Sequence, residues 1–388
     1  MTEISSSVNN LGNVLIRSDL NVPIINGVIS DDYRIYKSLE ILDKIYNNSK
    51  TITFSSHLGR PQKNSLEYSL EPVAKKMSKI LNQNVNFIDE IYGKKVNESI
   101  ENSESKINLI ENLRFHEGEV KNNDEFAKNV TRPFDSYIFD AFGASHRSHA
   151  SVVSFGNYLD SYQGPLMNNE IEQLDKLLSN EKTGYVVLLG GAKISDKLSL
   201  INNLLPKVEH LLIGGGMCFT FLKSMGYEIG KSLLEDSFIS KANDLLNSEH
   251  GHKIILPSDF GVTELIESEI REDINIKDFR NNHIGIDIGP NTVSSFSSIL
   301  LSSKNIFWNG PMGVFEIEKF SKGTKEITEI IAKSSAHTCI GGGDSVSAIN
   351  KFSDIKQFNH ISTGGGASLE YLEGKKLPGV NIYNSLII

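Results

Sequence analysis

TCIGGGDSVSAIN, residues 338–350, is the stretch around which we interpret the rest of this sequence. It opens with an apolar run suited to a buried strand, passes through the glycines 341–343, and continues in a pattern that fits a helix. A glycine turn between a strand and a helix directs free backbone N–H groups and the positive end of the helix dipole at one point, which favours an anion such as a phosphate. The alternative is a purely structural turn capped by Asp344 or Ser345.

Other stretches in the second half of the chain repeat this design. The turns are IGGG at 213–216, TGGG at 363–366 and GGAK at 190–193, and each follows an apolar run. Their repetition favours a nucleotide-phosphate site over isolated structural turns. Two familiar nucleotide signatures are absent, because no triplet completes G-x-G-x-x-G, and GYEIGKS at 226–232 is one residue short of a Walker A loop. We interpret that last segment as a surface turn.

Length and composition narrow the class of protein. A chain of 388 residues predicts two domains, and a net charge of −9 argues against a general binder of nucleic acid or membrane surfaces. The two cysteines, Cys218 and Cys339, form no C-x-x-C motif and are expected to be buried thiols in a reducing compartment. The N-terminus lacks a signal-peptide pattern, and no apolar run reaches membrane-spanning length. We therefore expect a cytoplasmic location.

Arginine is used sparingly and unevenly. Of 39 basic side chains eight are arginine, and six of those lie in the first 150 residues. A chain that otherwise uses lysine keeps arginine where a planar fork must hold a carboxylate or phosphate with two hydrogen bonds. The eight are Arg17, Arg34, Arg60, Arg114, Arg132, Arg147, Arg271 and Arg280.

Short apolar runs alternate with amphipathic patterns through most of the chain. Strands are expected at 13–18, 51–54, 85–88, 107–110, 137–139 and 185–189, and helical patterns at 34–45, 70–81 and 166–178. Residues 150–184 break this rhythm. We predict an α/β protein with two doubly wound (Rossmann-like) parallel-sheet domains. The expected division is 1–164, a connector helix 165–181, a second domain 182–370, and a C-terminal segment 371–388 that returns to the first domain.

Several polar residues directly follow predicted strands in the first half. Arg60, Arg114 and Arg147 do so, and so does the run 19–21, Asp-Leu-Asn. Ligands of doubly wound sheets bind at the carboxyl ends of the strands. Topology therefore predicts that these side chains converge on one edge of the sheet.

The ordered motifs resemble the phosphoglycerate kinase family over nearly the whole chain. The matching segments are RSDLNVP (17–23), 32–35, SHLGRP (56–61), ENLRFH (111–116), DAFGASHRSH (140–149), GGAKISDK (190–197), 214–220, WNGPMGVFE (308–316), GGGDS (341–345) and STGGGASL (362–369). The sequence departs from the family pattern at Ser18 and Leu20, where valine and phenylalanine are common. It also has Asn168 and Asn169 where a lysine–glutamate pair is frequent.

The resemblance implies reversible phosphoryl transfer between 1,3-bisphosphoglycerate and ADP, giving 3-phosphoglycerate and ATP, by a monomer without nucleic-acid or membrane partners. The implied phosphoglycerate-binding residues are Asp19, Leu20, Asn21, Arg34, His57, Leu58, Gly59, Arg60, Arg114, His146 and Arg147. The implied nucleotide-binding residues are Lys193, Lys197, Gly215, Asn309, Pro311, Gly313, Glu316, Gly342, Gly343, Asp344 and Ser345. Among these, Arg34, Lys193 and Lys197 are the implied catalytic residues, and Asp344 the implied ligand of Mg²⁺.

The residue inventory suits such a transfer. Both nucleophiles, a carboxylate and a nucleotide phosphate, are ionised at neutral pH, so charge neutralisation and alignment are needed instead of a general base. Two alternatives remain: a dinucleotide-binding module or oxidoreductase, and a non-catalytic homologue. The absent G-x-G-x-x-G motif weighs against the first, and the presence of Arg34, Lys193, Lys197 and Asp344 against the second.

Overall fold

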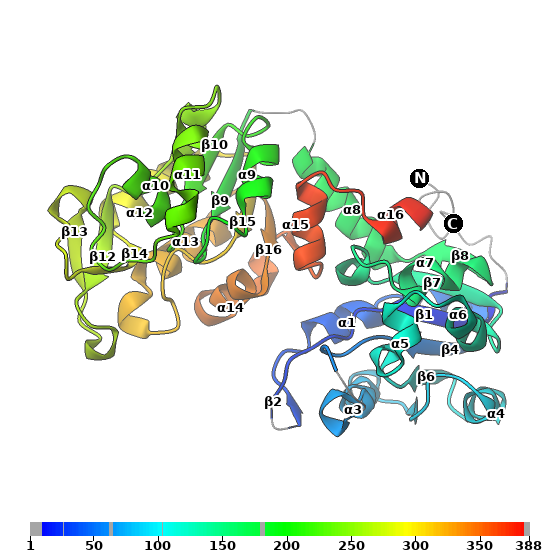
Figure 1. Cartoon of the computed structure of the whole chain (residues 1–388). Helices are drawn as coiled ribbons and strands as arrows, with labels where there is room; N and C mark the ends of the chain where they lie inside the picture. Colours follow the sequence, from blue (N-terminus) through cyan, green and yellow to red (C-terminus); the bar gives the residue numbers. More distant parts are fainter. Residues whose placement is uncertain (1–9, 26, 62–64, 103, 179–182, 384–388) are drawn as a thin grey trace. The chain divides into compact units, whose positions relative to one another are not determined.

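The structure is a computed structural model that describes residues 10–25, 27–61, 65–102, 104–178 and 183–383 (Figure 1). The described chain forms two compact units, which we treat separately. The first unit ends at Glu172 and resumes at Lys376, and the second unit runs from Gln173 to Lys375. Residues 179–181 of the expected connector and 384–388 of the expected C-terminal segment lie outside the described residues.

A parallel sheet forms the centre of the first unit. Within the described residues it has six strands in the order β5-β6-β4-β1-β7-β8, and every neighbouring pair is parallel. The strands β4, β5 and β6 lie on one side of β1, and β7 and β8 lie on the other side, so the strand order reverses between β1 and β7. The strands are β1 (Gly12–Ser18), β4 (Ser49–Ser55), β5 (Val85–Ile88), β6 (Ile107–Ile110), β7 (Ser136–Asp140) and β8 (Asp160–Gln163).

The predicted strands of the first unit are confirmed, and three features differ from the sequence expectation. β8 lies in the segment 150–184 where no strand was expected, and the helical pattern over 34–45 is divided at Glu40 and Ile41 into two helices. A short antiparallel hairpin, β2 (Ile24–Ile25) with β3 (Val28–Ile29), was also missed. The helices are α1 (Tyr33–Leu39), α2 (Leu42–Ile45), α3 (Glu71–Leu81), α4 (Lys94–Asn102), α5 (Glu117–Val120), α6 (Asp124–Thr131), α7 (Ala150–Val153) and α16 (Pro378–Tyr383).

A second parallel sheet forms the centre of the second unit. Its order is β11-β10-β9-β15-β16-β17, with all neighbours parallel, and the strand order reverses between β9 and β15. The strands are β9 (Tyr185–Leu189), β10 (His210–Ile213), β11 (Ile254–Ile255), β15 (Asn305–Asn309), β16 (His337–Gly341) and β17 (His360–Ile361). The helices are α9 (Leu198–Leu204), α10 (Cys218–Ser224), α11 (Ile239–Leu246), α12 (Pro290–Ser302), α13 (Lys322–Lys333), α14 (Gly343–Phe352) and α15 (Gly366–Leu372), while α8 (Pro165–Leu178) contains the division between the units.

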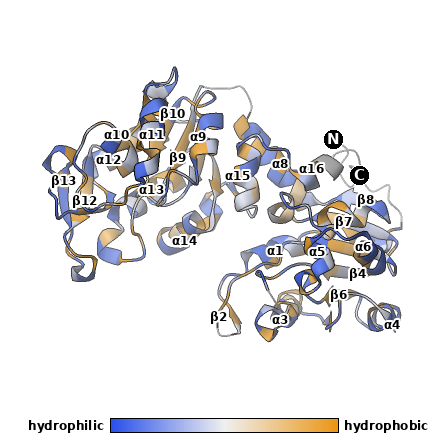
Figure 2. Cartoon of the chain, in the orientation of Figure 1, coloured by the Kyte–Doolittle hydropathy of each residue, from blue (hydrophilic) through white to orange (hydrophobic). Residues whose placement is uncertain are grey.

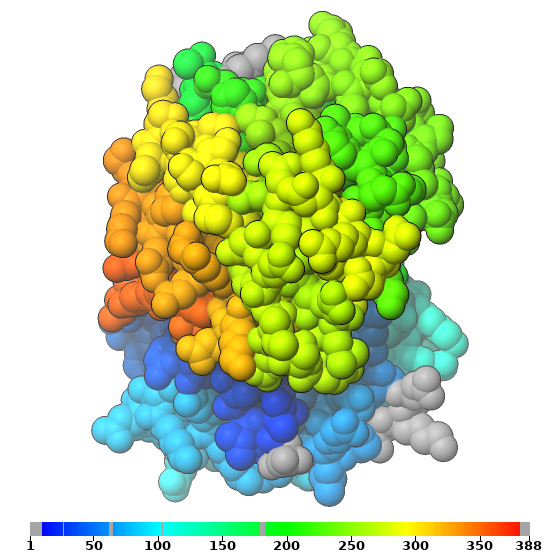
Figure 3. All heavy atoms as spheres, turned by 90° about the vertical axis from the view of Figure 1, so that its left-hand side faces the viewer, coloured from blue at the N-terminus to red at the C-terminus, as the bar shows by residue number. Residues whose placement is uncertain are grey.

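The second unit also carries an antiparallel sheet that the sequence did not predict. It consists of β12 (Asp259–Thr263), β13 (Glu272–Asn275) and β14 (Ile284–Ile288), with β12 between the other two. The edge strand β13 reads EDIN and is largely exposed, so it lacks the apolar pattern of a buried strand. Arg271 joins the sheet by ion pairs of 2.8 Å to Asp273 and to Asp287. This sheet lies on the side of the unit that faces the viewer in Figure 3.

Burial explains why the central strands were recognisable. Every residue of β6, β7 and β9 is buried, as expected for a parallel sheet covered by helices on both faces. Figure 2 shows these sheets as mainly apolar, whereas helices such as α3 carry both polar and apolar residues. Among the described residues, no helix is both long enough and apolar enough to cross a membrane.

Candidate active site

The carboxyl ends of β1, β4, β6 and β7 bring the phosphoglycerate-binding candidates of the first unit together. The loop after β1 holds Asp19 and Asn21, and the loops after β4, β6 and β7 hold the remaining candidates except Arg34, which lies in α1. The reversal of strand order between β1 and β7 separates the loops at this edge, which is where doubly wound sheets bind ligands.

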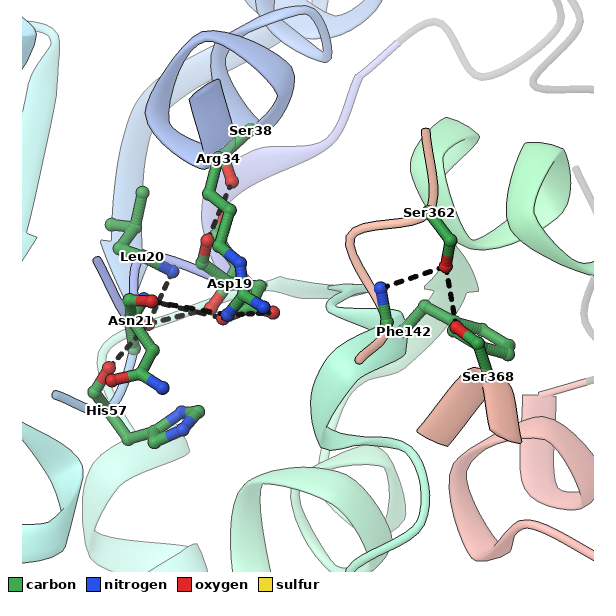
Figure 4. A network of polar contacts seen from close by, with 12 residues as sticks. Asp19, Leu20, Asn21, Arg34, Ser38, His57, Phe142, Ser362 and Ser368 are labelled. Carbon is green, nitrogen blue, oxygen red and sulfur yellow. Dashed lines mark hydrogen bonds and ion pairs between the residues drawn. The ribbon is translucent and has the colours of Figure 1, made fainter. Parts of the chain in front are cut away.

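Asp19 and Arg34 form the first part of this site (Figure 4). The Arg34 Nη1 lies 3.2 Å from each carboxylate oxygen of Asp19 and donates to the backbone carbonyl of Asn21, also at 3.2 Å. Asp19 is buried, whereas the Arg34 side chain is 31% exposed. The Nε and Nη2 of Arg34 have no hydrogen-bond partner among the described residues, so this face of the guanidinium can accept an anionic ligand.

The loops after β1 and β4 are joined by Asn21 and Gly59. The Gly59 N–H donates to the Asn21 side chain at 2.9 Å. Gly59 has a φ of +61°, and an added Cβ would lie 2.4 Å from the Tyr68 ring, so glycine is required here by both conformation and space. The candidates Leu20 and Leu58 are buried in the core, and their side chains therefore shape the loop from below.

His57 is a further buried polar group of the site, and Arg114 beside it is partly buried. Burial, and then the neighbouring charges of Arg17 and Arg114, hold the pKa of His57 well below its usual value, so its imidazole is neutral at pH 7. The Arg114 Nη1 donates to the Gly59 carbonyl at 2.6 Å. Burial, and then the charge of Arg17, lower the pKa of Arg114 to about 10, which still leaves it charged. An entering anion would stabilise this group of positive charges.

Arg60 and Arg147 complete the positive edge. Both are exposed, both influence the pKa of Arg114 electrostatically, and neither side chain is hydrogen-bonded to another described residue. His146 precedes Arg147 in the same loop and is partly exposed. Exposed cations near one another and without carboxylate partners are typical of an anion site. The structure thus gathers the predicted arginines of this unit at one edge, as topology required.

Sequence reasoning assigned no role to three residues beneath this edge, Arg17, Glu119 and Ser151. Arg17 donates to the Ser151 hydroxyl and to His57 Nδ1, each at 2.9 Å, and Ser151 donates to Glu119 at 2.6 Å. All three side chains are buried. The unusual placement of an arginine inside the apolar strand 12–18 was the available signal for Arg17, whereas Glu119 in the polar run HEGEV had none.

In the second unit, glycine loops after β9, β10 and β15 pack directly on one another. The Gly191 N–H donates to the Pro311 carbonyl at 3.0 Å, and the Gly215 N–H donates to the Met312 carbonyl at 3.0 Å. An added Cβ at Gly215 would lie 2.5 Å from the backbone of Gly191, and one at Gly310 would lie 2.5 Å from the carbonyl of Gly190. Glycine is needed here so that the loops can approach, which is a packing role separate from phosphate contact.

A cavity of about 230 Å³ opens beside these loops. Gly191, Gly215 and Gly216 form part of its wall, and the predicted nucleoside contacts Pro311, Gly313 and Glu316 form another part, with Asp344 at one side. Phe219, Leu233 and Phe260 give it an apolar surface that suits a flat base. None of these three apolar residues was predicted as a site residue, and the antiparallel sheet that supplies Phe260 was missed as well.

Lys197 and Asn309 connect the strand ends next to this cavity. The Lys197 ammonium is hydrogen-bonded to the Asn309 side-chain oxygen, and the Asn309 nitrogen donates to the Gly341 carbonyl at 2.8 Å. Burial lowers the pKa of Lys197 to about 8, while Asp196 and Asp344 raise it. An adjacent phosphate would favour the charged form of Lys197.

The remaining candidates lie around the start of α14. Gly342, with a φ of +90°, precedes Gly343 and Asp344 in the first turn, and both of these are exposed. Ser345 is buried, and its hydroxyl accepts from the Gly310 N–H at 2.7 Å, so its side chain joins two loops. Lys193 is exposed. Among the described residues there is no group of three or more His, Cys, Asp or Glu that could hold a metal, so Asp344 would contribute a single carboxylate.

Comparison with known proteins gives one consistent result. The family model described as phosphoglycerate kinase matches residues 7–375. Phosphoglycerate kinases of Thermosipho africanus and Finegoldia magna are 48% and 47% identical to the chain, each over 95% of it and over 94% and 95% of their own lengths. The solved phosphoglycerate kinase structures from Coxiella burnetii and Pyrococcus horikoshii match with TM-scores of 0.87 each, at 38% and 30% identity, over 99% and 100% of the chain and 98% and 100% of theirs.

Proposed function

The chain belongs to the phosphoglycerate kinase family, and on that premise we propose which of its residues carry out each part of the reaction. The reaction is reversible phosphoryl transfer between 1,3-bisphosphoglycerate and ADP, giving 3-phosphoglycerate and ATP in glycolysis. The enzyme is thus a phosphotransferase with a carboxyl group as acceptor. We further propose that the enzyme is a cytoplasmic monomer, that it uses Mg²⁺, and that it closes over its substrates.

The first unit binds the phosphoglycerate. The observation that supports this is the set of charges at the carboxyl edge of its sheet, where Arg60, Arg114 and Arg147 lie near one another without carboxylate partners among the described residues. The substrate carries a phosphate and a carboxylate, and guanidinium groups bind both with paired hydrogen bonds. Asp19 and Asn21 suit its hydroxyl group, because they combine acceptors with a nearby donor.

The second unit binds the nucleotide. Its cavity has an apolar part for the base and Glu316 for the ribose, and Asp344 of the cavity wall belongs to the start of α14, where Gly342 and Gly343 would meet the phosphates. The expected cofactor is Mg²⁺ bound together with ADP or ATP. Mg²⁺ is commonly held by one or two carboxylates plus substrate phosphates, so the single carboxylate of Asp344 fits a metal that arrives with the nucleotide. That metal would neutralise charge on the phosphates.

Transfer depends on charge neutralisation and alignment. Arg34 offers an unpartnered guanidinium face, and Lys193 and Lys197 supply positive charge next to the nucleotide loops. Because donor and acceptor bind to different units, we propose that the enzyme closes over both substrates and excludes water before an in-line transfer. No general base is required, because the attacking oxygen is already ionised.

A coupled assay tests the function directly. The purified chain should consume ATP in the presence of 3-phosphoglycerate and Mg²⁺, and Arg60→Ala should raise the KM for 3-phosphoglycerate while leaving the KM for ATP nearly unchanged. An unaltered KM for 3-phosphoglycerate in Arg60→Ala would contradict the assignment of the first unit. Absence of turnover in the unmodified chain would favour the non-catalytic alternative.

A further inference from the structure

Glu119 lies beneath the positive edge of the first unit without touching it. It belongs to the short helix α5, and its carboxylate accepts from the Ser151 N–H at 2.9 Å and from the Ser151 hydroxyl at 2.6 Å. His149 Nδ1 lies 3.6 Å from the same carboxylate. The residue is fully buried, and burial of an ionised carboxylate costs free energy unless the group is paired and hydrogen-bonded.

The direction of each hydrogen bond follows from the chemistry of the groups. Because an ionised carboxylate can only accept, the Ser151 hydroxyl must donate to Glu119, and its lone pairs remain for the Arg17 Nε at 2.9 Å. Although burial opposes ionisation, the contact with His149, the charge of Arg17 and the hydrogen bonds from Ser151 together lower the pKa of Glu119. Glu119 is therefore ionised at neutral pH.

Arg17 connects Ser151 with His57 and thereby fixes which ring nitrogen of His57 carries the proton. Each nitrogen of its guanidinium makes one contact, since Nε donates to Ser151, Nη1 to the Ser18 carbonyl, and Nη2 contacts His57 Nδ1 at 2.9 Å. Arginine has no acceptor, so His57 Nδ1 must be the acceptor and its ring proton must sit on Nε2. The fixed positive charges that act on His57 are those of Arg17, Arg114 and Arg34, and together with an electrostatic contribution from His149 they oppose a second proton on the ring.

We propose that Glu119 is a positioning residue: through Ser151 and Arg17 it holds His57 as the neutral Nε2–H tautomer, so that this histidine can only donate to a bound phosphoglycerate anion. The inference rests on the proposed function of the first unit. Glu119 also supplies the negative charge that opposes the mutual repulsion of Arg17, Arg114, Arg60 and Arg147, because it raises the pKa of Arg114 while the arginines lower it. A substrate site made of cations is thereby kept assembled when empty.

Glu119→Gln removes the charge and keeps the shape. If the NH₂ group of the glutamine amide faces the Ser151 N–H, two hydrogen-bond donors oppose each other. If the amide is turned around, the NH₂ group donates to the Ser151 hydroxyl, whose hydrogen then loses its acceptor. Both orientations weaken the hold of Ser151 on Arg17. We expect the KM for 3-phosphoglycerate to rise about tenfold, with the KM for ATP unchanged.

The tautomer of His57 provides a readout that a purely structural role would not change. In ¹⁵N NMR of the full-length protein at pH 7, with assignment by His57→Gln, the unmodified protein should show an unprotonated Nδ1 and a protonated Nε2. Glu119→Gln should show a mixture of tautomers. If Glu119→Gln does not fold, Ser151→Ala serves as the second variant, because it removes the hydroxyl bound by Arg17 and leaves the carboxylate in place.

Ser154→Ala is the matched control. Ser154 directly follows α7, the helix that contains Ser151, and it is buried. Its hydroxyl donates to the Asn122 side-chain oxygen at 2.7 Å, away from the contacts that connect Glu119 with His57, so its loss should leave the His57 spectrum and the KM for 3-phosphoglycerate unchanged. A proton on Nδ1 of His57 in the unmodified protein would overturn the inference, and so would Glu119→Gln with an unchanged His57 spectrum and KM. If Arg60→Ala leaves the KM for 3-phosphoglycerate unaltered, the proposed function of the unit fails, while the tautomer measured without ligand still tests the inference.

Discussion

Arg34→Lys should separate the contribution of Arg34 to substrate binding from its contribution to phosphoryl transfer. Arg34 Nη1 contacts both carboxylate oxygens of Asp19 and the Asn21 carbonyl, each at 3.2 Å. A lysine ammonium can keep part of the ion pair with Asp19, and the side chain of Arg34 is about one-third exposed. The change should therefore cost about 1 kcal/mol of stability or less. The variant should fold normally.

The expected effect on turnover is much larger. Because Nε and Nη2 of Arg34 have no partner among the described residues, this face can bridge two oxygens of the phosphoryl group in transit. A lysine cannot reproduce that bridge. Losing one positioned donor to the transition state typically costs about 3 kcal/mol, so kcat should fall by a factor of roughly 10²–10³.

Steady-state kinetics with both substrates varied, together with thermal unfolding, tests this prediction. The KM values for 3-phosphoglycerate and ATP should stay near those of the unmodified enzyme, and Tm should change little. Arg60→Ala is the contrast, because Arg60 is expected to act mainly through the KM for 3-phosphoglycerate. A variant Arg34→Lys that keeps kcat while this KM rises would refute the reasoning and make Arg34 one more binding arginine.

Four further predictions address other parts of the molecule. Asp344→Asn should leave α14 intact, because the N-cap of this helix is Gly342 and has no side-chain hydrogen bond, but it should weaken Mg-ADP binding and turnover; isothermal titration with Mg-ADP showing normal affinity would exclude the metal role. Gly342→Ala should lower nucleotide affinity, measured by the same titration, because φ is +90° and a Cβ would lie 2.7 Å from the Asn309 nitrogen; unchanged affinity would mean that this loop relaxes freely. Burial raises the pKa of Asp140 to about 7 despite hydrogen bonds from the N–H groups at the start of α8, so the folded state favours the protonated carboxyl and the unmodified protein should lose stability from about pH 4 to 7. A series of Tm measurements should show this loss in the unmodified protein but not in Asp140→Asn, and parallel pH profiles of the two proteins would contradict the prediction. Small-angle scattering should show a smaller radius of gyration with both substrates bound than with either alone, and an unchanged radius would count against closure.

The sequence by itself determined the class of fold and the loops that form the two candidate sites. Strands buried on both faces must be short apolar runs, so β6 and β9 could be assigned with their ends, and residues after such strands must meet at one edge of a parallel sheet. The positions of Arg60, Arg114 and Arg147 after predicted strands therefore predict that these three residues lie together. The search for apolar runs failed for β13, whose polar residues form an exposed edge strand because a neighbouring strand and Arg271 hold it in place.

Only the tertiary structure decided what each charged residue does at those edges. Arg17 lies near the end of β1 and Arg60 in the loop after β4, yet Arg17 is buried and makes a contact through each guanidinium nitrogen while Arg60 is exposed. The partner that distinguishes them, Ser151, lies 134 positions from Arg17 in the chain. Burial and hydrogen bonding depend on groups brought together by folding, and their effect on charge is strongest where water is excluded. A local pattern can therefore predict where a charge lies, whereas its protonation and its task follow from distant neighbours such as Glu119.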